Sequence, residues 1–301
     1  MAELTNEFSW SRSRDATFRE CRRRYWFQYY GSWGGWAASA DPQTREIYIL
    51  KQLKSRQMWA GEVVHTCIQR SLTNLRAGIE PLPVETILSL ALDQMRTEWK
   101  QSRERVYRAR PRTTGLFEHE YEVEVSDAEW RANAEHVASC LKTFYASDTY
   151  RFIRALPRER FLEIEDFSSF QLDGTRVHVK LDFACREGDR HHIFDWKTGR
   201  RDDEDNSIQL ACYALYASER WGPAPDNVRT VEFNLARNAL REYAVTSADI
   251  DRTRNYVRGS IRDMLALLRD PSGNDADRES CPLTTELWRC RTCSFKRLCD
   301  R

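Results

Sequence analysis

The fold is decided by residues 175–197, which have the sequence TRVHVKLDFACREGDRHHIFDWK. Polar and apolar residues alternate over 175–184, as they do in a strand with one buried face. Residues 187–190 (EGDR) are typical of a tight turn, because glycine accepts a positive φ. Residues 191–197 form the returning strand, so the stretch predicts a β-hairpin.

The turn also predicts the register of the hairpin. If Gly188 and Asp189 form a two-residue loop, counting back along both strands places Asp182 directly opposite Asp195. Side chains alternate between the faces of a strand, so Asp182, Asp195 and Lys197 share one face. The other face carries apolar side chains that we expect to enter a core: Val177, Val179, Leu181, Phe183 and Phe194.

Two carboxylates at cross-strand distance repel each other unless a cation lies between them. A divalent metal ion beside Lys197 is the simplest arrangement that places a cation there. The alternative is a solvated strand face on which an aspartate and a lysine form a weak ion pair.

Length and composition are those of a globular protein. The chain has 301 residues, enough for one large domain or two modest ones, and 41% of them are apolar. No apolar run approaches the roughly 20 residues that span a bilayer. Residues 1–7 lack the basic and apolar regions of a secretory signal. We therefore expect a protein of the cytoplasm.

Arginine dominates the basic residues. The net charge is only +1, but the 47 basic residues include just seven lysines. Arginine pairs with phosphate through two hydrogen bonds and stacks on bases. A genome rich in arginine codons explains the overall excess equally well, whereas local clusters favour binding of nucleic acid. The clusters are Arg12, Arg14, Arg19, Arg22, Arg23 and Arg24, and then Arg103, Arg105, Arg108, Arg110 and Arg112.

Helices and strands alternate along the rest of the chain. An aromatic and basic segment over 8–36 contains a helix from Phe18 to Tyr30. Further helices are predicted over 45–75, 83–105, 127–148, 207–220 and 249–268, and further strands over 160–172, 228–235 and 240–245. This order predicts an α/β fold with four regions: 1–40, the aromatic and arginine-rich segment; 41–157, a helical region; 158–270, a mixed core; and 271–301, a cysteine-rich segment.

The nine cysteines fall into two groups. Four lie in apolar helices or strands and are expected to be buried small hydrophobic residues: Cys67, Cys140, Cys185 and Cys212. By contrast, Cys290, Cys293 and Cys299 follow the spacing C-x2-C-x5-C, which can surround one metal centre if a fourth ligand is present. Cys281 as the fourth ligand would give a local zinc knuckle. Cys21 would instead give a cluster that staples the two ends of the chain together.

These motifs together resemble the PD-(D/E)XK nuclease superfamily, and within it the RecB-like branch that carries a four-cysteine iron–sulfur cluster. That branch includes the AddB nuclease domain, the CRISPR adaptation exonucleases and exonuclease V. The resemblance covers nearly the whole chain and rests on six motifs in order: Ser9-x-Ser11-Arg12 before Cys21, Gly61-x-x-x-His65, Asp182 after Gly174, Asp195-x-Lys197, Gln209-x-x-x-Tyr213, and the C-terminal cysteines. The chain departs from the family pattern in having Leu181 before Asp182 instead of proline, and in its extra Cys281.

The resemblance implies a restriction-endonuclease-like fold, with a mixed central sheet flanked by helices and an N-terminal helical region. It implies that Mg²⁺ or Mn²⁺ is bound by His65, Asp182, Asp195 and the backbone carbonyl of Trp196. Lys197 would hold or help to deprotonate the attacking water. Two further residues, Gln209 and Tyr213, would position the DNA strand or the lysine, and Glu165 would be an outer carboxylate.

The resemblance also assigns roles to the two ends of the chain. A [4Fe-4S] cluster would be held by Cys21, Cys290, Cys293 and Cys299, in a structural role. The surface beside it would steer and stack single-stranded DNA through Arg12, Arg22, Arg23, Arg24 and Trp26.

The implied function is a DNA exonuclease or end-trimming nuclease that prefers single strands and acts in repair, recombination or antiviral defence. Two alternatives remain. One is a catalytically quiet nucleic-acid-binding subunit of a larger complex, and the other is a zinc-knuckle interaction protein. Because the chain contains no G-x-x-x-x-G-K-[ST] motif, a helicase partner would have to be a separate chain.

Overall fold

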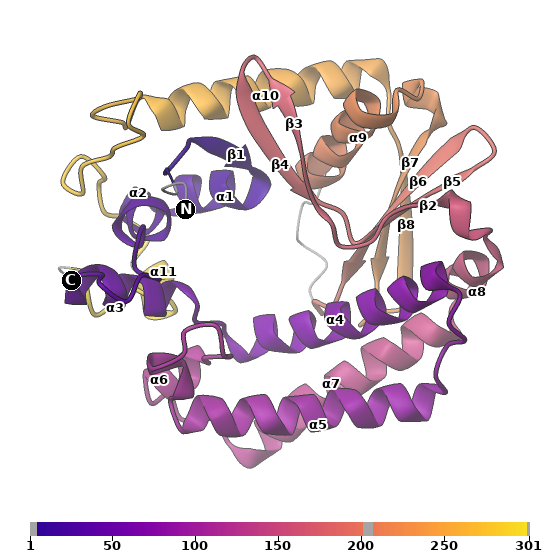
Figure 1. Cartoon of the computed structure of the whole chain (residues 1–301), viewed down its shortest axis with the longest axis horizontal. Coiled ribbons are helices and arrows are strands. Elements are labelled where there is room, and N and C mark those ends of the chain that lie inside the picture. The colour runs from indigo at the N-terminus through magenta and orange to yellow at the C-terminus, as the bar shows by residue number, and fades with distance from the viewer. Residues whose placement is uncertain (1–4, 201–206, 300–301) are drawn as a thin grey trace.

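The computed structural model describes residues 5–200 and 207–299. Two mixed β-sheets are flanked by helices, as Figure 1 shows. The larger sheet has the strand order β2 (Phe161–Glu163), β5 (Phe183–Glu187), β6 (Arg190–Lys197), β7 (Val228–Asn234) and β8 (Ala239–Ala244). The smaller sheet has the order β1 (Ser9–Ser11), β4 (Thr175–Lys180) and β3 (Phe167–Leu172). The expected α/β, restriction-endonuclease-like architecture is confirmed, although its central sheet is divided in two.

The helices are distributed along the whole described chain. The longer ones are α1 (Arg12–Glu20), α3 (Pro42–Lys51), α4 (Arg56–Ala77), α5 (Val84–Arg103), α7 (Asp127–Ala146), α8 (Asp148–Ala155), α9 (Ser207–Trp221) and α10 (Ser247–Leu265). Shorter pieces are α2 (Arg22–Trp26), the π-helix η1 (Phe27–Gly31), α6 (Phe117–Glu120), α11 (Trp288–Arg291) and the 3₁₀ turns η2 (Val106–Arg108), η3 (Arg158–Arg160) and η4 (Pro225–Asn227). None of the described helices is both long and apolar enough to cross a membrane.

The predicted register of the hairpin is confirmed. Strands β5 and β6 are antiparallel, with Glu187 paired to Arg190 and Phe183 paired to Phe194. The next position in that register would set Asp182 against Asp195. The sequence signal was strong here because a two-residue turn and strict alternation both specify the same pairing.

The prediction of a single strand over 175–184 is wrong, because the strand is interrupted at Leu181 and Asp182. The part before the break, β4, belongs to the smaller sheet, and the part after it, β5, belongs to the larger one. The apolar side chains on either side therefore enter different cores. Val177 packs with the N-terminal aromatic residues, whereas Phe183 and Phe194 pack against α4, α5 and α7 on one face of the larger sheet.

Three other predicted elements are also divided. Residues 160–172 form β2 and β3, one in each sheet. The helix predicted over 45–75 is interrupted before Ser55, whose side chain accepts a hydrogen bond from the N–H of Met58 and caps α4. The N-terminal helix breaks at Cys21, which has extended backbone angles of φ −163° and ψ 115°.

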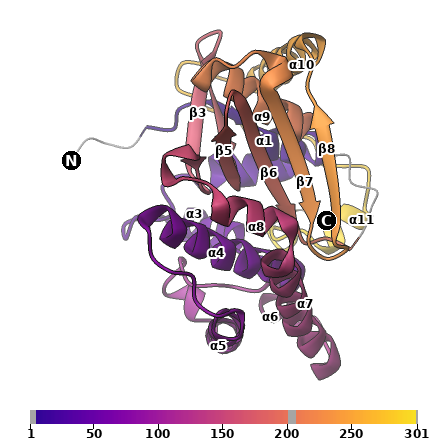
Figure 2. The same cartoon turned by 90° about the vertical axis from the view of Figure 1, so that its right-hand side faces the viewer.

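The larger sheet is covered on both faces. Phe194 and Trp196 of β6 point to the face where α4, α5 and α7 pack. Figure 2 shows these three helices in the lower part of the view, beside the strands of the larger sheet. Ile193 points to the opposite face, where α9 packs. Asp195 and Lys197 alternate with these apolar residues, so they emerge on the α9 side.

The two ends of the described chain meet. Arg23 of α2 donates a hydrogen bond of 2.9 Å from Nε to the carbonyl of Cys281. The rings of Phe27 and Phe295 are stacked, with centroids 5.1 Å apart. Figure 1 shows α2, α3 and α11 gathered on the same side of the molecule.

Candidate active site

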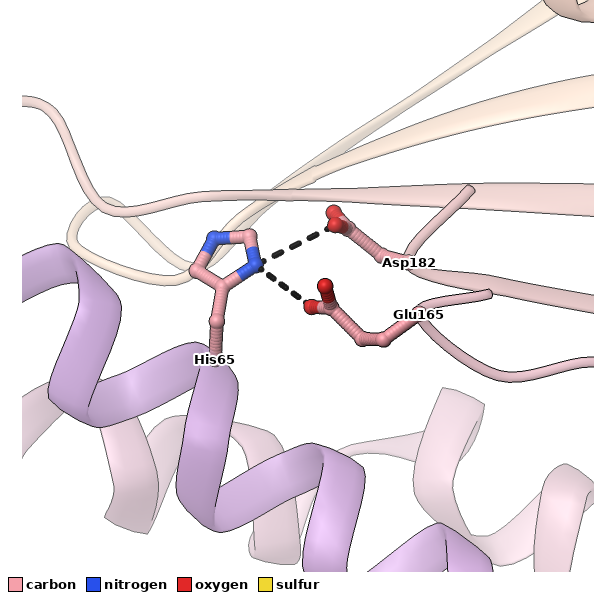
Figure 3. A group of neighbouring side chains, drawn as sticks. All are labelled: His65, Glu165 and Asp182. Atoms are coloured by element: carbon pink, nitrogen blue, oxygen red, sulfur yellow. Dashed lines mark hydrogen bonds and ion pairs between the residues drawn. The ribbon is translucent and has the colours of Figure 1, made fainter. Parts of the chain in front are cut away.

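Three titratable side chains from distant parts of the chain converge at the break between the two sheets. His65 comes from α4, Glu165 from the turn between β2 and β3, and Asp182 from the bend between β4 and β5 (Figure 3). Nδ1 of His65 lies 3.0 Å from Oε1 of Glu165 and 3.1 Å from Oδ1 of Asp182. One ligand atom from each of the three lies within 4.8 Å of the others.

A glycine allows α4 to bring His65 this close. Gly61 lies one turn before His65 on the same face of the helix. A Cβ atom at Gly61 would be only 2.9 Å from Oγ1 of Thr198, the residue that follows Lys197. The G-x-x-x-H spacing therefore places a histidine and a glycine on one face of α4. Because Gly61 has no side chain, there is room beside it for Thr198, at the end of β6.

Glu165 is more central than the sequence suggested. Its φ of 55° turns the chain between the two sheets, and its N–H donates to the carbonyls of Leu181 (2.9 Å) and Asp182 (3.2 Å). Its other carboxylate oxygen pairs with Lys180 at 2.5 Å. Burial raises the pKa of Glu165, but His65 and Lys180 outweigh burial and lower it overall. We expected an outer carboxylate, but the structure places Glu165 in direct contact with His65.

A second group of polar side chains lies around Asp195. Its Oδ2 is 2.8 Å from the ammonium of Lys197, and its Oδ1 accepts a hydrogen bond of 3.0 Å from Nε2 of Gln209. Lys197 also donates to Oε1 of Gln209 at 3.1 Å. Tyr213 contacts the same carboxylate oxygen at 3.3 Å and donates to the carbonyl of Lys180. The four residues Asp195, Lys197, Gln209 and Tyr213 thus form one connected polar network.

Burial and charge set the protonation of this site. Burial, followed by the charge of Asp182, raises the pKa of Asp195 to about 6. Burial lowers the pKa of Lys197, but the carboxylate of Asp195 outweighs burial and raises it overall. Burial likewise opposes the charged form of His65, yet Asp182 and Glu165 raise its pKa to about 10. The site therefore holds three buried carboxylates, with which His65, Lys180 and Lys197 form ion pairs.

The donor set suits a hard divalent cation. Two carboxylates and one imidazole converge, and such oxygen-rich ligation with one nitrogen fits Mg²⁺ or Mn²⁺. In addition, the buried Oδ2 of Asp195 accepts no hydrogen bond in the described structure, although it forms an ion pair with Lys197. Asp195 lies outside the three-residue group because its oxygens turn toward Lys197, Gln209 and Tyr213. The backbone of Trp196 contributes an N–H that donates to Asp182 at 2.6 Å.

A cavity of about 740 Å³ adjoins this site. Its lining includes Lys180, Gln209 and Tyr213, together with residues of the N-terminal segment such as Arg12 and Arg14. The N-terminal segment can approach because β1 runs parallel to β4, with Ser11 paired to His178.

Most of the arginines expected to contact DNA have other partners. Arg23 is only 5% exposed and binds the carbonyl of Cys281 and the carboxylate of Glu279, so it belongs to the interior. Trp26 donates from its indole to the carbonyl of Ala276 at 2.7 Å. These contacts hold both residues against the C-terminal part of the described chain, and their role in binding DNA stays a prediction. The clusters looked alike in sequence because a run of arginines does not reveal which side chains face inward.

The other three arginines remain at or near the surface. Arg12 lines the cavity beside the active site and lies 3.4 Å from Asp15. Arg22 packs over the ring of Phe18, and Arg24 pairs with Glu20 at 2.9 Å.

The four cysteines expected to act together line one cavity of about 440 Å³: Cys21, Cys290, Cys293 and Cys299. Cys281 is fully buried beside them and is not part of the cavity wall. The helix break described above places Cys21 there, and its sulfur accepts a hydrogen bond of 3.4 Å from the N–H of Arg24.

Comparison with known proteins identifies the family. The family model of the PD-(D/E)XK nuclease superfamily matches residues 9–300, so the chain belongs to this superfamily. Members are nucleases that typically use Mg²⁺ or Mn²⁺, and a nuclease of this kind binds DNA. The search of curated proteins gave no match. One of the matching solved structures is described as "Crystal structure of SSO0001"; it shares 14% identity and covers 61% of this chain and 91% of its own, with a TM-score of 0.29, too low to support an argument.

Proposed function

We propose that this chain is an active metal-dependent DNA nuclease of the exonuclease or end-trimming type, with a preference for single strands. The observation that supports this best is the contact network of Asp195, Lys197, Gln209 and Tyr213 beside the His65–Glu165–Asp182 group. A catalytically quiet binding subunit would have no need for a buried, mutually repelling pair of aspartates.

His65, Asp182 and Asp195 are the proposed metal ligands, joined by the carbonyl of Trp196, and Glu165 is added to the set. When bound, the metal supplies Lewis-acid stabilisation of the scissile phosphate and lowers the pKa of a bound water. For Asp195 to join the metal ligands, its Oδ2 would turn from the ammonium of Lys197, which lies 2.8 Å away.

Lys197 acts as a cation in this mechanism. Its raised pKa keeps the ammonium protonated, so it donates to a phosphate oxygen and orients the attacking water. Water forms one new P–O bond and gives up one proton to the solvent, the P–O bond to the leaving deoxyribose oxygen breaks, and the leaving oxygen takes up one proton from the solvent. Gln209 holds Lys197 and Asp195 in place by bonding both.

We also propose that Cys21, Cys290, Cys293 and Cys299 hold a [4Fe-4S] cluster. Tetrahedral zinc with Zn–S bonds near 2.3 Å would need sulfurs about 3.8 Å apart. Within residues 5–200 and 207–299, no three cysteine sulfurs meet within 4.8 Å, so a larger inorganic core is the better fit. Cys21, Cys290 and Cys293 are free thiols, which suits a reducing compartment such as the cytoplasm.

The test is cleavage of end-labelled single- and double-stranded DNA by anaerobically purified protein, with Mg²⁺ or Mn²⁺, beside a Lys197→Ala variant. Metal-dependent cleavage that the variant loses supports the nuclease. If DNA is bound but not cleaved with either metal, the chain is a binding subunit or requires a separate partner such as a helicase. One zinc per chain without labile sulfide would instead contradict the iron–sulfur assignment.

A further inference from the structure

The cavity beside the active site contains two cations that the proposed mechanism does not use. Arg14 and Lys51 line it together with Gln209 and Tyr213. Arg14 is only 4% exposed, yet within residues 5–200 and 207–299 no carboxylate lies within 4.0 Å of either Arg14 or Lys51. A buried positive charge without a carboxylate is costly unless another group stabilises it.

Arg14 is held rigidly by neutral groups. Nε donates to the hydroxyl of Tyr25, Nη1 to the carbonyl of Ser9 and Nη2 to the hydroxyl of Tyr30, each at 3.0 Å. The ring of Tyr29 lies 4.5 Å from the guanidinium carbon. These bonds engage three of the five N–H groups of the guanidinium. The described contacts leave the other two available to an anion.

Lys51 lies at the last position of α3, within the same wall. Its Nζ is 5.8 Å from the centre of the Tyr29 ring, the ring that also contacts Arg14. Burial and then repulsion by Arg14 lower the pKa of Lys51. An anion bound beside both cations would relieve that repulsion.

We propose that Arg14 and Lys51 form a phosphate subsite, which binds one backbone phosphate of a single DNA strand at a fixed place relative to the scissile bond. The subsite extends the proposed nuclease function and rests on it. Arginine supplies a planar fork and lysine a point charge, a pairing suited to a phosphodiester group.

Aromatic side chains in the same cavity favour a single strand over a duplex. Phe167 is 73% exposed and stacks on His178, with centroids 4.5 Å apart and planes at 21°. Trp33, at 39% exposure, lines the cavity as well. Unpaired bases offer free faces for such stacking, whereas paired bases inside a duplex do not.

Binding is measured first, in EDTA, so that no cleavage is needed. A labelled single-stranded oligonucleotide is titrated over a range of salt concentrations with wild type, Lys51→Gln, Lys51→Met and Arg14→Lys. Loss of one phosphate contact lowers the slope of log Kd against log salt by about 0.7 for a single strand. We expect this decrease in slope for Lys51→Gln and Lys51→Met, together with an affinity for DNA about tenfold weaker than that of wild type. Lys51→Arg, which keeps the charge, should recover the wild-type slope.

The matched control is Lys142→Gln, which removes an exposed lysine from α7. It should leave the slope unchanged. With metal added, the Lys51 variants should raise KM and leave kcat within about twofold, because the subsite binds the ground state and the transition state alike.

Several results overturn the subsite. One is an unchanged slope in both Lys51→Gln and Lys51→Met with normal melting curves, and another is equal affinity for a blunt duplex of the same length. The nuclease activity is tested separately. If DNA binds with the expected slopes but is not cleaved with either metal, the phosphate subsite is supported and the nuclease activity is rejected. Should Lys51→Gln and Lys51→Met both fail to fold, the affinity of Arg14→Lys decides. Its slope should match that of wild type because the charge is kept, but its affinity should fall several-fold because lysine cannot reproduce the fork geometry. Wild-type affinity in a folded Arg14→Lys would then reject the subsite.

Discussion

The backbone N–H of Trp196 donates a hydrogen bond of 2.6 Å to Oδ2 of Asp182. The strand β5 begins one residue later, at Phe183, so the carboxylate takes the place that a backbone carbonyl would occupy in a longer ladder. Asp182 is thereby fixed with its other oxygen, Oδ1, aimed at His65. The same hydrogen bond therefore ends the strand pairing and fixes the orientation of the Asp182 carboxylate.

This double role predicts different effects for two substitutions. Asp182→Asn retains an acceptor for the N–H of Trp196, whereas Asp182→Ala leaves that buried donor unpaired. We expect Asp182→Ala to lower the free energy of unfolding by about 1–3 kcal/mol, and Asp182→Asn to change it little. Both should abolish metal-dependent cleavage. Urea denaturation and cleavage assays measure the two properties, and equal stability of the two variants would contradict the capping role.

Neutralising Asp195 should stabilise the protein without metal. Its pKa is raised from 3.8 to about 6, so its ionisation opposes folding increasingly as the pH rises from about 3.8 through 6. In the presence of a chelator, the melting temperature of Asp195→Asn should exceed that of wild type at pH 7.5, and this difference should shrink toward zero below pH 4. Added Mn²⁺ should raise the melting temperature of wild type only. A variant that melts below wild type at every pH would exclude this electrostatic account.

Gly61→Ala should reduce activity more than stability. The new methyl group would meet Oγ1 of Thr198 at 2.9 Å and displace the end of β6 just beyond Lys197. The matched control is Gly259→Ala in α10, where a Cβ meets nothing within 4 Å and alanine should stabilise the helix by up to about 1 kcal/mol. Adding Thr198→Ala to Gly61→Ala removes the clashing oxygen and should restore much of the cleavage rate. Equal cleavage rates for Gly61→Ala and wild type would show that the close approach is unimportant.

Glu165→Gln should weaken metal binding while leaving the fold intact. Glutamine keeps an oxygen toward His65 but lacks the charge that a divalent cation requires. We expect an increase in the Mn²⁺ dissociation constant of at least tenfold, measured by titration of the free protein. Glu163→Gln, on the neighbouring strand β2, controls for loss of a buried carboxylate that does not contact His65. An unchanged Mn²⁺ affinity in Glu165→Gln would show that Glu165 does not bind the metal directly.

Cysteine substitutions should separate ligands from buried neighbours. Cys293→Ser and Cys21→Ser are expected to lose iron and labile sulfide and to melt at lower temperature. Cys281→Ser should retain both, because Cys281 lies outside the wall of the cysteine cavity. Iron analysis and thermal melts of anaerobically purified proteins make the measurement. If Cys281→Ser loses the iron and Cys21→Ser keeps it, the fourth ligand is the local one.

Regular patterns in the sequence were enough to predict the hairpin and its register. Alternation and a two-residue turn act over a few residues, so Asp182 and Asp195 could be set opposite each other without tertiary information. Gln209 and Tyr213 were placed together for a similar reason, as they lie one helical turn apart. These predictions needed only the geometry of a strand and a helix.

The positions that escaped prediction depend on breaks in regular structure. Glu165 enters the site through a positive φ at the change from one sheet to the other, and nothing in its local sequence requires that conformation. Cys21 was expected beside the C-terminal cysteines, but the helix break that places it there was not predicted. Arg14 and Arg23 have the same sequence character as their neighbours, and only tertiary packing separates a buried arginine from an exposed one.

The contact between the two ends of the chain has a consequence for biosynthesis. Arg23 bonds the carbonyl of Cys281 and Phe27 stacks on Phe295, so the first helices cannot dock fully until residues 281–295 have left the ribosome. Those same helices build one wall of the cavity at the active site. A nascent chain that lacks residues 281–295 is therefore unable to complete this wall.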